Sequence, residues 1–82
     1  MLKTDFLLLM DELFEFDDGT IQGGDELNQI RGWSSLTFIG LIAMVDEECG
    51  IALAPKSIMA CRTVDDLIGL LGDAIEPPAA AA

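Results

Sequence analysis

The segment 35–49 constrains the fold of this chain most, because it is bounded both by signals that begin a helix and by signals that end one. Ser34 stands directly before it, where a serine side chain caps the first free backbone amides of a helix. Gly50 follows it, where a glycine ends a helix, and Ile51 is placed to pack just beyond. The pattern predicts one long helix. Its expected buried face comprises Phe38, Leu41, Ile42 and Val45.

Three further segments have the signals of helices. Residues 3–16 repeat apolar side chains at helical spacing, with Thr4 as the expected cap and residues 17–19 as the expected end. Residues 55–60 begin with a proline, which suits the first position of a helix, and predict a short helix. The last helix is expected to begin at Thr63, which has the spacing of a capping box. The inner faces of the first and last helices are predicted to be Phe6, Leu9, Met10, Leu13, Val64, Leu67, Ile68 and Leu71.

A long connection, residues 17–33, joins the first two helices and contains several glycines. A loop of this length is unusual in a small domain and often serves a function. Residues 25–30 are expected to form a short turn of helix, while Leu27, Ile30 and Trp33 anchor the loop on the core. The sequence therefore predicts an all-α, four-helix bundle with a long first loop and a short third helix.

The chain has 82 residues and a formal charge of −11, from 15 acids and four bases. This length predicts one domain, residues 1–76, followed by a flexible Pro/Ala tail, residues 77–82. The charge disfavours binding to nucleic acid and favours partners with basic patches, although it can also serve solubility alone. We expect no membrane insertion, because no apolar run approaches the roughly 20 residues of a membrane span. We also expect a cytoplasmic monomer.

The chain lacks the residues that most catalytic mechanisms need. Without a histidine, the chain cannot form a Ser-His or Cys-His pair, and two cysteines alone would make a poor zinc site. We expect Cys49 and Cys61 to be small, unbridged residues of a reducing compartment. Gly23 and Gly24 lack the lysine and the spacing of a phosphate-binding loop. The sequence predicts no enzyme, no catalytic residue and no metal site.

One site remains, where the long loop meets the predicted helix and places Ser34 and Ser35 at its start. A helix N-terminus offers unpaired N–H groups and positive potential, which suit a phosphate. Ordinary helix capping is the other explanation for serines at this place.

Residues 32–36, Gly-Trp-Ser-Ser-Leu, with the helix after them, resemble the attachment site of acyl carrier proteins, where Asp-Ser-Leu begins the second helix. The acids 46–48 followed by Cys-Gly-Ile resemble the end of that helix, and residues 62–67 resemble the start of the family's fourth helix. The resemblance implies that Ser35 carries covalent 4′-phosphopantetheine, which a phosphopantetheinyl transferase attaches. Ser34 is then the helix cap and the alternative attachment residue.

Three positions depart from the family's pattern. Ser34 replaces the usual Asp, which in the family is associated with recognition by the transferase. The sequence therefore does not identify which transferase accepts this chain. Residues 37–45 contain no acid, although fatty-acid carriers place acids there for basic partners. Cys49 stands where Phe is common. These departures favour a specialised carrier.

The second predicted helix also suggests a docking surface beside Ser35, mostly apolar with an acidic lower edge. Its residues are Leu36, Ile39, Gly40, Ala43 and Glu47. The alternative is that Leu36 and Ile39 belong to the core.

The resemblance implies a carrier of acyl intermediates, held as thioesters on the arm, in fatty-acid, lipid or polyketide-type biosynthesis. Its partners would be the enzymes that load and transfer the acyl groups. An aminoacyl carrier, D-alanyl or peptidyl, is one alternative, which Trp33 favours slightly. A non-catalytic acidic interaction domain is another, and it predicts no arm.

Overall fold

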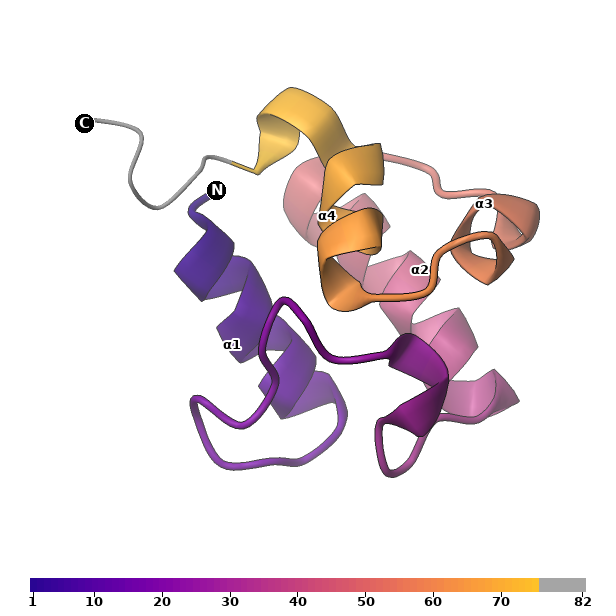
Figure 1. Ribbon diagram of the computed structural model, residues 1–82. Coiled ribbons are helices and arrows are strands. Elements are labelled where there is room, and N and C mark those ends of the chain that lie inside the picture. Colours follow the sequence, from indigo (N-terminus) through magenta and orange to yellow (C-terminus); the bar gives the residue numbers. More distant parts are fainter. Residues whose placement is uncertain (76–82) are drawn as a thin grey trace.

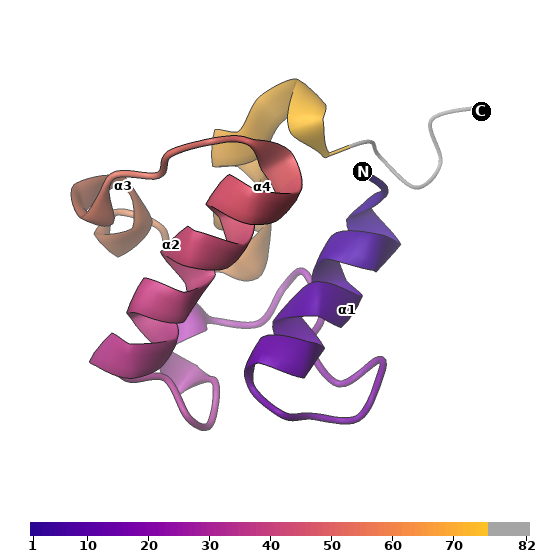
Figure 2. The same ribbon diagram turned by 180° about the vertical axis from the view of Figure 1, so that it is seen from behind.

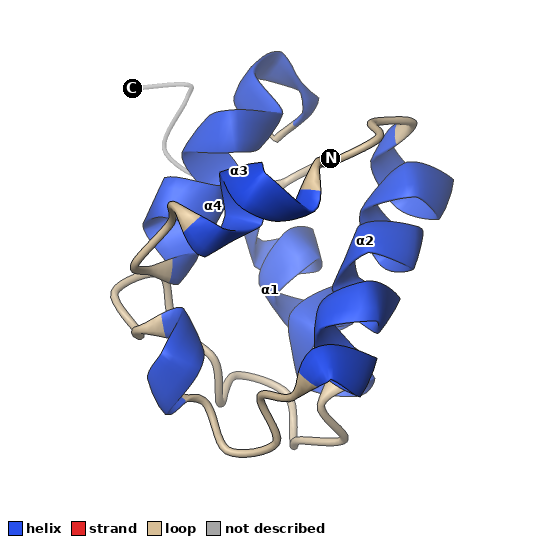
Figure 3. Ribbon diagram, turned by 90° about the vertical axis from the view of Figure 1, so that its right-hand side faces the viewer, coloured by secondary structure: helices blue, strands red, loops and turns tan. Residues whose placement is uncertain are grey.

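The computed structural model describes residues 1–75 and consists of helices joined by loops (Figure 1). The α-helices are α1 (Lys3–Leu13), α2 (Ser35–Cys49), α3 (Pro55–Met59) and α4 (Val64–Leu71), and the short 3-10 turns are η1 (Leu27–Gln29) and η2 (Gly72–Ala74). The described residues contain no β-strand (Figure 3). Glu26 and Thr63 form an isolated antiparallel bridge. The predicted four-helix class, with its long first loop and short third helix, is confirmed.

Figure 2 shows α1 and α2 side by side, with α4 behind the space between them and the long first loop across one end of the bundle. The expected domain boundary at residue 76 and the tail 77–82 lie outside the described residues. None of the helices within residues 1–75 is long and apolar enough to cross a membrane.

Helix α2 begins and ends where its local signals predict, and α4 begins where its capping signal predicts. Gly50 ends α2 in the left-handed conformation, at φ 69°. Thr63 caps α4, because the Asp66 amide donates to Thr63 Oγ1 (3.2 Å). In return the Asp66 carboxylate accepts from the amides of Thr63 (3.1 Å) and Arg62 (3.0 Å). These hydrogen bonds stabilise the charged carboxylate and lower the pKa of Asp66 below its usual value.

The prediction for α1 was right about its first residue, Lys3, but wrong about its cap and its end. The helix begins after Leu2, which makes no side-chain cap, so Thr4 is not its cap. It ends at Leu13 rather than at residue 16. The amide of Glu15, whose φ is 60°, donates to the Glu12 carbonyl (3.1 Å), and the following amide donates to the Asp11 carbonyl (2.8 Å). This is a Schellman ending. It uses Glu15 where a glycine is usual, so no local stop signal marks the end of α1 in the sequence.

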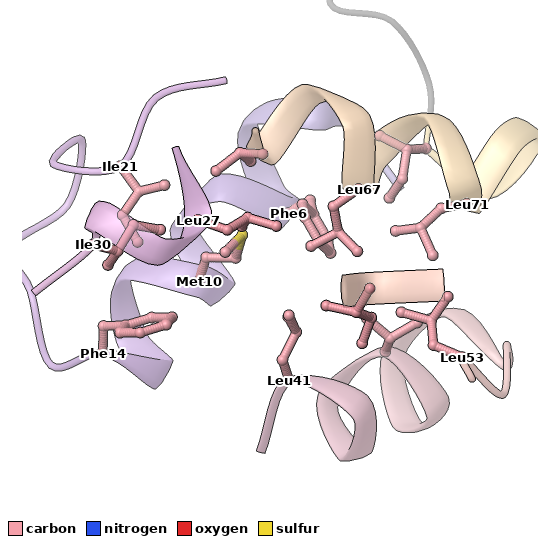
Figure 4. Packing of buried hydrophobic residues seen from close by; sticks show 14 residues of the cluster. Phe6, Met10, Phe14, Ile21, Leu27, Ile30, Leu41, Leu53, Leu67 and Leu71 are labelled. Carbon is pink, nitrogen blue, oxygen red and sulfur yellow. The ribbon is translucent and has the colours of Figure 1, made fainter. Parts of the chain in front are cut away.

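One apolar core joins all four helices and the first loop (Figure 4). Its buried residues are Phe6, Met10, Phe14, Ile21, Leu27, Ile30, Leu41, Val45, Leu53, Ile58, Val64, Leu67, Leu71 and Ile75. The predicted loop anchors Leu27 and Ile30 are among them, and Trp33 packs half-buried against the cluster. Four predicted inner-face residues are likewise only half-buried against the core: Leu13, Phe38, Ile42 and Ile68. Leu9 is half-buried as well, but it is not among the residues that pack against the core, so its assignment to the inner face was wrong.

The buried carboxylate of Asp11 holds the first loop against α1. Its side chain is 0% exposed. The Gly19 amide donates to Asp11 Oδ2 (2.9 Å), and the Ile21 amide donates to Asp11 Oδ1 (2.8 Å). Each oxygen of the buried charge thus has a partner, and two loop amides that the helix cannot satisfy are paired.

The second half of the loop pairs with the start of α4. The Leu27 amide donates to the Arg62 carbonyl (2.9 Å), and the Val64 amide donates to the Asp25 carbonyl (3.0 Å). The Asp65 amide donates to the Gly23 carbonyl (2.8 Å). A Cβ built on Gly23 would collide with the Asp65 carboxylate, so a residue with a side chain at position 23 would displace that exposed side chain.

We predict that Asp11→Ala destabilises the fold by about 3 kcal/mol, because it leaves two loop amides without their charged acceptor. Urea unfolding of the variant and the parent protein measures this as a lower midpoint. Glu12→Ala is the matched control, since Glu12 is the exposed neighbour on the same helix; its effect should stay within about 0.5 kcal/mol. Equal midpoints for the two variants would contradict the role of Asp11.

Candidate functional site

Ser34 is committed to holding the start of α2. Its Oγ accepts from the Thr37 amide (3.4 Å), and its own amide donates to Thr37 Oγ1 (2.9 Å), which completes a capping box. The Thr37 hydroxyl also donates to the Gly32 carbonyl (2.9 Å). Ser34 therefore has the capping role that the sequence predicts, and Thr37 ties the cap back to the loop.

Ser35 is the first residue of α2, and its side chain is exposed. No group in the part of the chain that the structure describes hydrogen-bonds its hydroxyl. It stands at the positive end of a 15-residue helix, whose first amides have no partner within the helix. Of the two adjacent serines, Ser35 is thus the one whose hydroxyl is available for chemistry, and a phosphate on it would gain about 0.3–1 kcal/mol from the helix dipole.

An open groove of about 640 Å³ lies beside this serine. It is lined by Leu27, Asn28, Trp33, Ser34, Ser35, Phe38, Ile58, Met59, Ala60, Cys61 and Arg62. The Trp33 indole meets the Phe38 ring edge-on, at 6.0 Å between centroids, and stacks on Phe14 behind it at 6.2 Å. Because the Phe14 ring is buried in the core, this stack fixes the aromatic wall of the groove.

Much of the predicted docking surface of α2 is exposed. Leu36 is 79% exposed and Ile39 is 63% exposed, so neither is a core residue in this structure. Ala43 and Glu47 are exposed as well. Gly40 differs, because it is half-buried and a Cβ on it would lie 2.9 Å from Leu13 Cδ1 of α1. It therefore lies where α2 approaches α1 closely, at the edge of the exposed surface.

The two cysteines are unpaired thiols and half-buried. Burial raises the pKa of Cys61, helped by the nearby Asp66 carboxylate, and its Sγ donates to the Ser57 carbonyl (3.3 Å). Burial also raises the pKa of Cys49. Both thiols therefore stay protonated and poorly nucleophilic at neutral pH. Within residues 1–75, no group of three potential ligand residues could hold a metal ion.

Sequence reasoning found both serines but missed several residues around them. Thr37 completes the cap. Its position three residues after Ser34, which is the spacing of a capping box, is the signal that could have found it. Asn28, Ile58 and Arg62 reach the groove only through the fold of the loop and of α3, and no local pattern in the sequence reveals them.

These features define a small helical domain that presents an exposed serine hydroxyl at a helix start, beside an apolar groove. The chain belongs to the family described as "Phosphopantetheine attachment site", whose model matches residues 24–71. The protein is thus a carrier domain of the kind that bears covalent 4′-phosphopantetheine, as the resemblance to acyl carrier proteins implies. Neither the curated proteins nor the solved structures contain a match.

The different roles of the two serines can be separated by stability. We predict that Ser34→Ala lowers the free energy of unfolding by about 1 kcal/mol, through loss of the cap. Ser35→Ala should change it by less than about 0.5 kcal/mol, because the side chain is exposed and alanine favours the helix. Thermal and urea unfolding measure both. A larger loss of unfolding free energy for Ser35→Ala than for Ser34→Ala would contradict the assignment of Ser34 as the helix cap.

Proposed function

We propose that Ser35 is the attachment residue and that the protein carries acyl intermediates as thioesters between enzymes of fatty-acid, lipid or polyketide-type biosynthesis. The observation that supports this choice is the contrast between the two hydroxyls. The Ser34 hydroxyl accepts from the Thr37 amide, whereas the Ser35 hydroxyl is exposed and makes no hydrogen bond within the described residues.

The residues around Ser35 fit a phosphopantetheine group. Apart from the Thr37 amide, which Ser34 Oγ accepts, the first amides of α2 have no partner within the helix and would suit a phosphate on Ser35. The neutral cap Ser34 adds no repelling charge there. The groove beside Ser35 offers apolar and polar surface at the root of the arm. When bound, the group supplies a terminal thiol on a flexible tether, which holds acyl groups and raises their effective concentration at a partner enzyme.

Within residues 1–75, no side chain hydrogen-bonds the Ser35 hydroxyl to activate it. It lacks histidine, and its two cysteine thiols have raised pKa values. We propose that the protein is not an enzyme, and that a phosphopantetheinyl transferase supplies the base that takes the Ser35 proton. Loading and transfer of the acyl group likewise belong to partner enzymes.

We propose that partner enzymes dock on the exposed side of α2, over Leu36, Ile39 and Ala43, with Gly40 at its edge and Glu47 as its acidic end. Its first ten residues carry no acid, whereas its last turn contains Asp46, Glu47 and Glu48. A fitting partner therefore presents an apolar surface next to the arm and basic groups further along the helix. This division of charge along α2 favours a specialised carrier. We further propose that its working form is a cytoplasmic monomer.

An aminoacyl carrier is the second candidate, since Trp33 stands before the serines and lines the groove. Loading with candidate adenylating enzymes, followed by mass spectrometry of the arm, separates it from an acyl carrier. A purely non-catalytic interaction domain without an arm does not agree with the family match.

The attachment is tested by incubating the protein with coenzyme A and a broad-specificity phosphopantetheinyl transferase, and measuring the intact mass. We predict that the parent protein and Ser34→Ala gain one phosphopantetheine group, whereas Ser35→Ala gains none. Peptide mapping of the parent then places the group on Ser35. The proposal fails if Ser35→Ala is modified as fully as the parent protein.

The docking surface is tested with Ile39→Asp, which introduces a charge at an exposed apolar position without touching the core. We predict that this variant folds as stably as the parent, but that the kcat/KM of the transferase acting on it falls about tenfold, which corresponds to about 1.4 kcal/mol of lost contact. Leu70→Asp is the matched control, an exposed leucine on α4 away from this surface. Equal kinetics for both variants would remove the docking role of Ile39.

A further inference from the structure

Thr37 lies in the first turn of α2, and its hydroxyl contacts several backbone groups of the segment that leads to Ser35. The Ser34 amide donates to Thr37 Oγ1 (2.9 Å). The same hydroxyl donates to the Gly32 carbonyl (2.9 Å), and the Ser34 carbonyl at 3.1 Å is its alternative acceptor. One side chain of α2 therefore holds the backbone on both sides of Trp33.

The turn at Gly32 brings its carbonyl within reach of Thr37. Gly32 has a φ of 93°, in the left-handed region that favours glycine. The Trp33 amide that follows donates to the Ile30 carbonyl (3.0 Å), so the turn is also held on its loop side. The chain thus enters α2 through a turn that is fixed at both ends, by Ile30 in the loop and by Thr37 in the helix.

Ser35 has no comparable anchor in its own side chain, which is exposed and makes no hydrogen bond within the described residues. Its position is therefore set by its neighbours, Ser34 and Thr37, which are bonded to each other in the capping box. The start of a helix loosens when its cap is lost, because the leading amides have no partner within the helix. The Thr37 hydroxyl thus determines how narrowly the backbone of Ser35 is held.

We propose that Thr37 is a positioning residue for the modification of Ser35, since its hydroxyl fixes the turn before Ser35 and so holds the Ser35 Oγ ready for the transfer step. The inference rests on the proposed attachment to Ser35. In that step the Ser35 Oγ forms a bond to the phosphorus next to the pantetheine of coenzyme A. The phosphoanhydride bond to this phosphorus breaks, adenosine 3′,5′-bisphosphate leaves, and the Ser35 proton passes to a base of the transferase.

This role predicts an effect on the transfer step rather than on docking. A displacement at phosphorus needs the attacking oxygen close to the phosphorus and aligned with the leaving oxygen, so a small misplacement of the nucleophile slows it strongly. Thr37 is half-buried and is not part of the docking surface proposed above. Loss of its hydroxyl should therefore slow transfer while leaving the affinity of the protein for the transferase nearly unchanged.

Two variants isolate the hydroxyl. Thr37→Val removes it but keeps the branched shape and a similar helix propensity, whereas Thr37→Ser keeps it. Single-turnover transfer from coenzyme A is measured by intact mass, with a broad-specificity transferase in excess and at varied concentration. For Thr37→Val we expect a saturating rate about tenfold lower than that of the parent, at a half-saturating concentration within roughly twofold of it. Thr37→Ser should recover at least half of the parent's saturating rate.

The fixed turn can also be observed without the transferase. The Ser34 amide donates to Thr37 Oγ1, so its hydrogen exchange in the apo protein, measured by NMR, reports whether this contact is present. The exchange should be several-fold faster in Thr37→Val and close to that of the parent in Thr37→Ser. Unchanged exchange in Thr37→Val would contradict the fixed turn.

Thr63→Val is the matched control, because Thr63 makes the same kind of capping box at the start of α4 and does not line the groove at Ser35. It should lower the urea midpoint about as much as Thr37→Val does, yet be modified as fast as the parent.

The positioning role is overturned if Thr37→Val reacts at the parent's rate, if it slows no more than Thr63→Val, or if Thr37→Ser does not recover the rate. A higher half-saturating concentration with an unchanged saturating rate would also overturn it, since Thr37 would then serve docking. If the parent protein gains no mass at all, the proposed function itself fails, and this inference with it.

Discussion

The buried carboxylate of Asp11 is the interaction on which the geometry of the site depends. It binds the amides of Gly19 and Ile21 and so fixes the first half of a long loop that has little regular structure of its own. Ile21 is thereby held in the core, and the chain continues to the pairing between residues 23–27 and the start of α4. With both connections in place, the η1 turn lies at the groove, where Leu27 and Asn28 join Trp33 and Ser35 in the lining.

Charge is unevenly distributed on this acidic protein, and the regions that contain few acids lie at the candidate site. The first ten residues of α2 carry no acid, the groove contains one arginine among its described lining, and the acids of α2 are confined to its last turn. For the partners with basic patches that we propose, a negative overall charge steers the carrier toward them over long distances. On the proposed docking surface, the final contact next to Ser35 is decided by shape and apolar area, since exposed Leu36 and Ile39 offer no charge to pair. Salt should therefore slow the approach to a partner more than it weakens the docked complex.

The features that the sequence predicted well are those that short stretches determine. Ser34 and Gly50 bound α2, and Thr63 caps α4, because capping needs only neighbouring residues. The end of α1 was missed because Glu15 adopts a positive φ that glycine usually supplies, in a turn stabilised by its surroundings. The burial of Asp11 and the approach of Arg62 to the groove depend on residues far along the chain, so no local pattern reveals them.

The pair of adjacent serines is best understood as a separation of two tasks that compete for one helix start. A helix of 15 residues needs a side-chain acceptor at its N-terminus, and an attachment site needs a hydroxyl that nothing else holds. Ser34 meets the first need, with Thr37 as its partner, and leaves Ser35 exposed for the second. A carboxylate at position 34 would also cap the helix, but it would stand beside a phosphate on Ser35. Two like charges about 4 Å apart near a protein surface repel by about 1–4 kcal/mol. The neutral capping box caps the helix without that repulsion, so the positive end of α2 is left to the phosphate that we propose on Ser35.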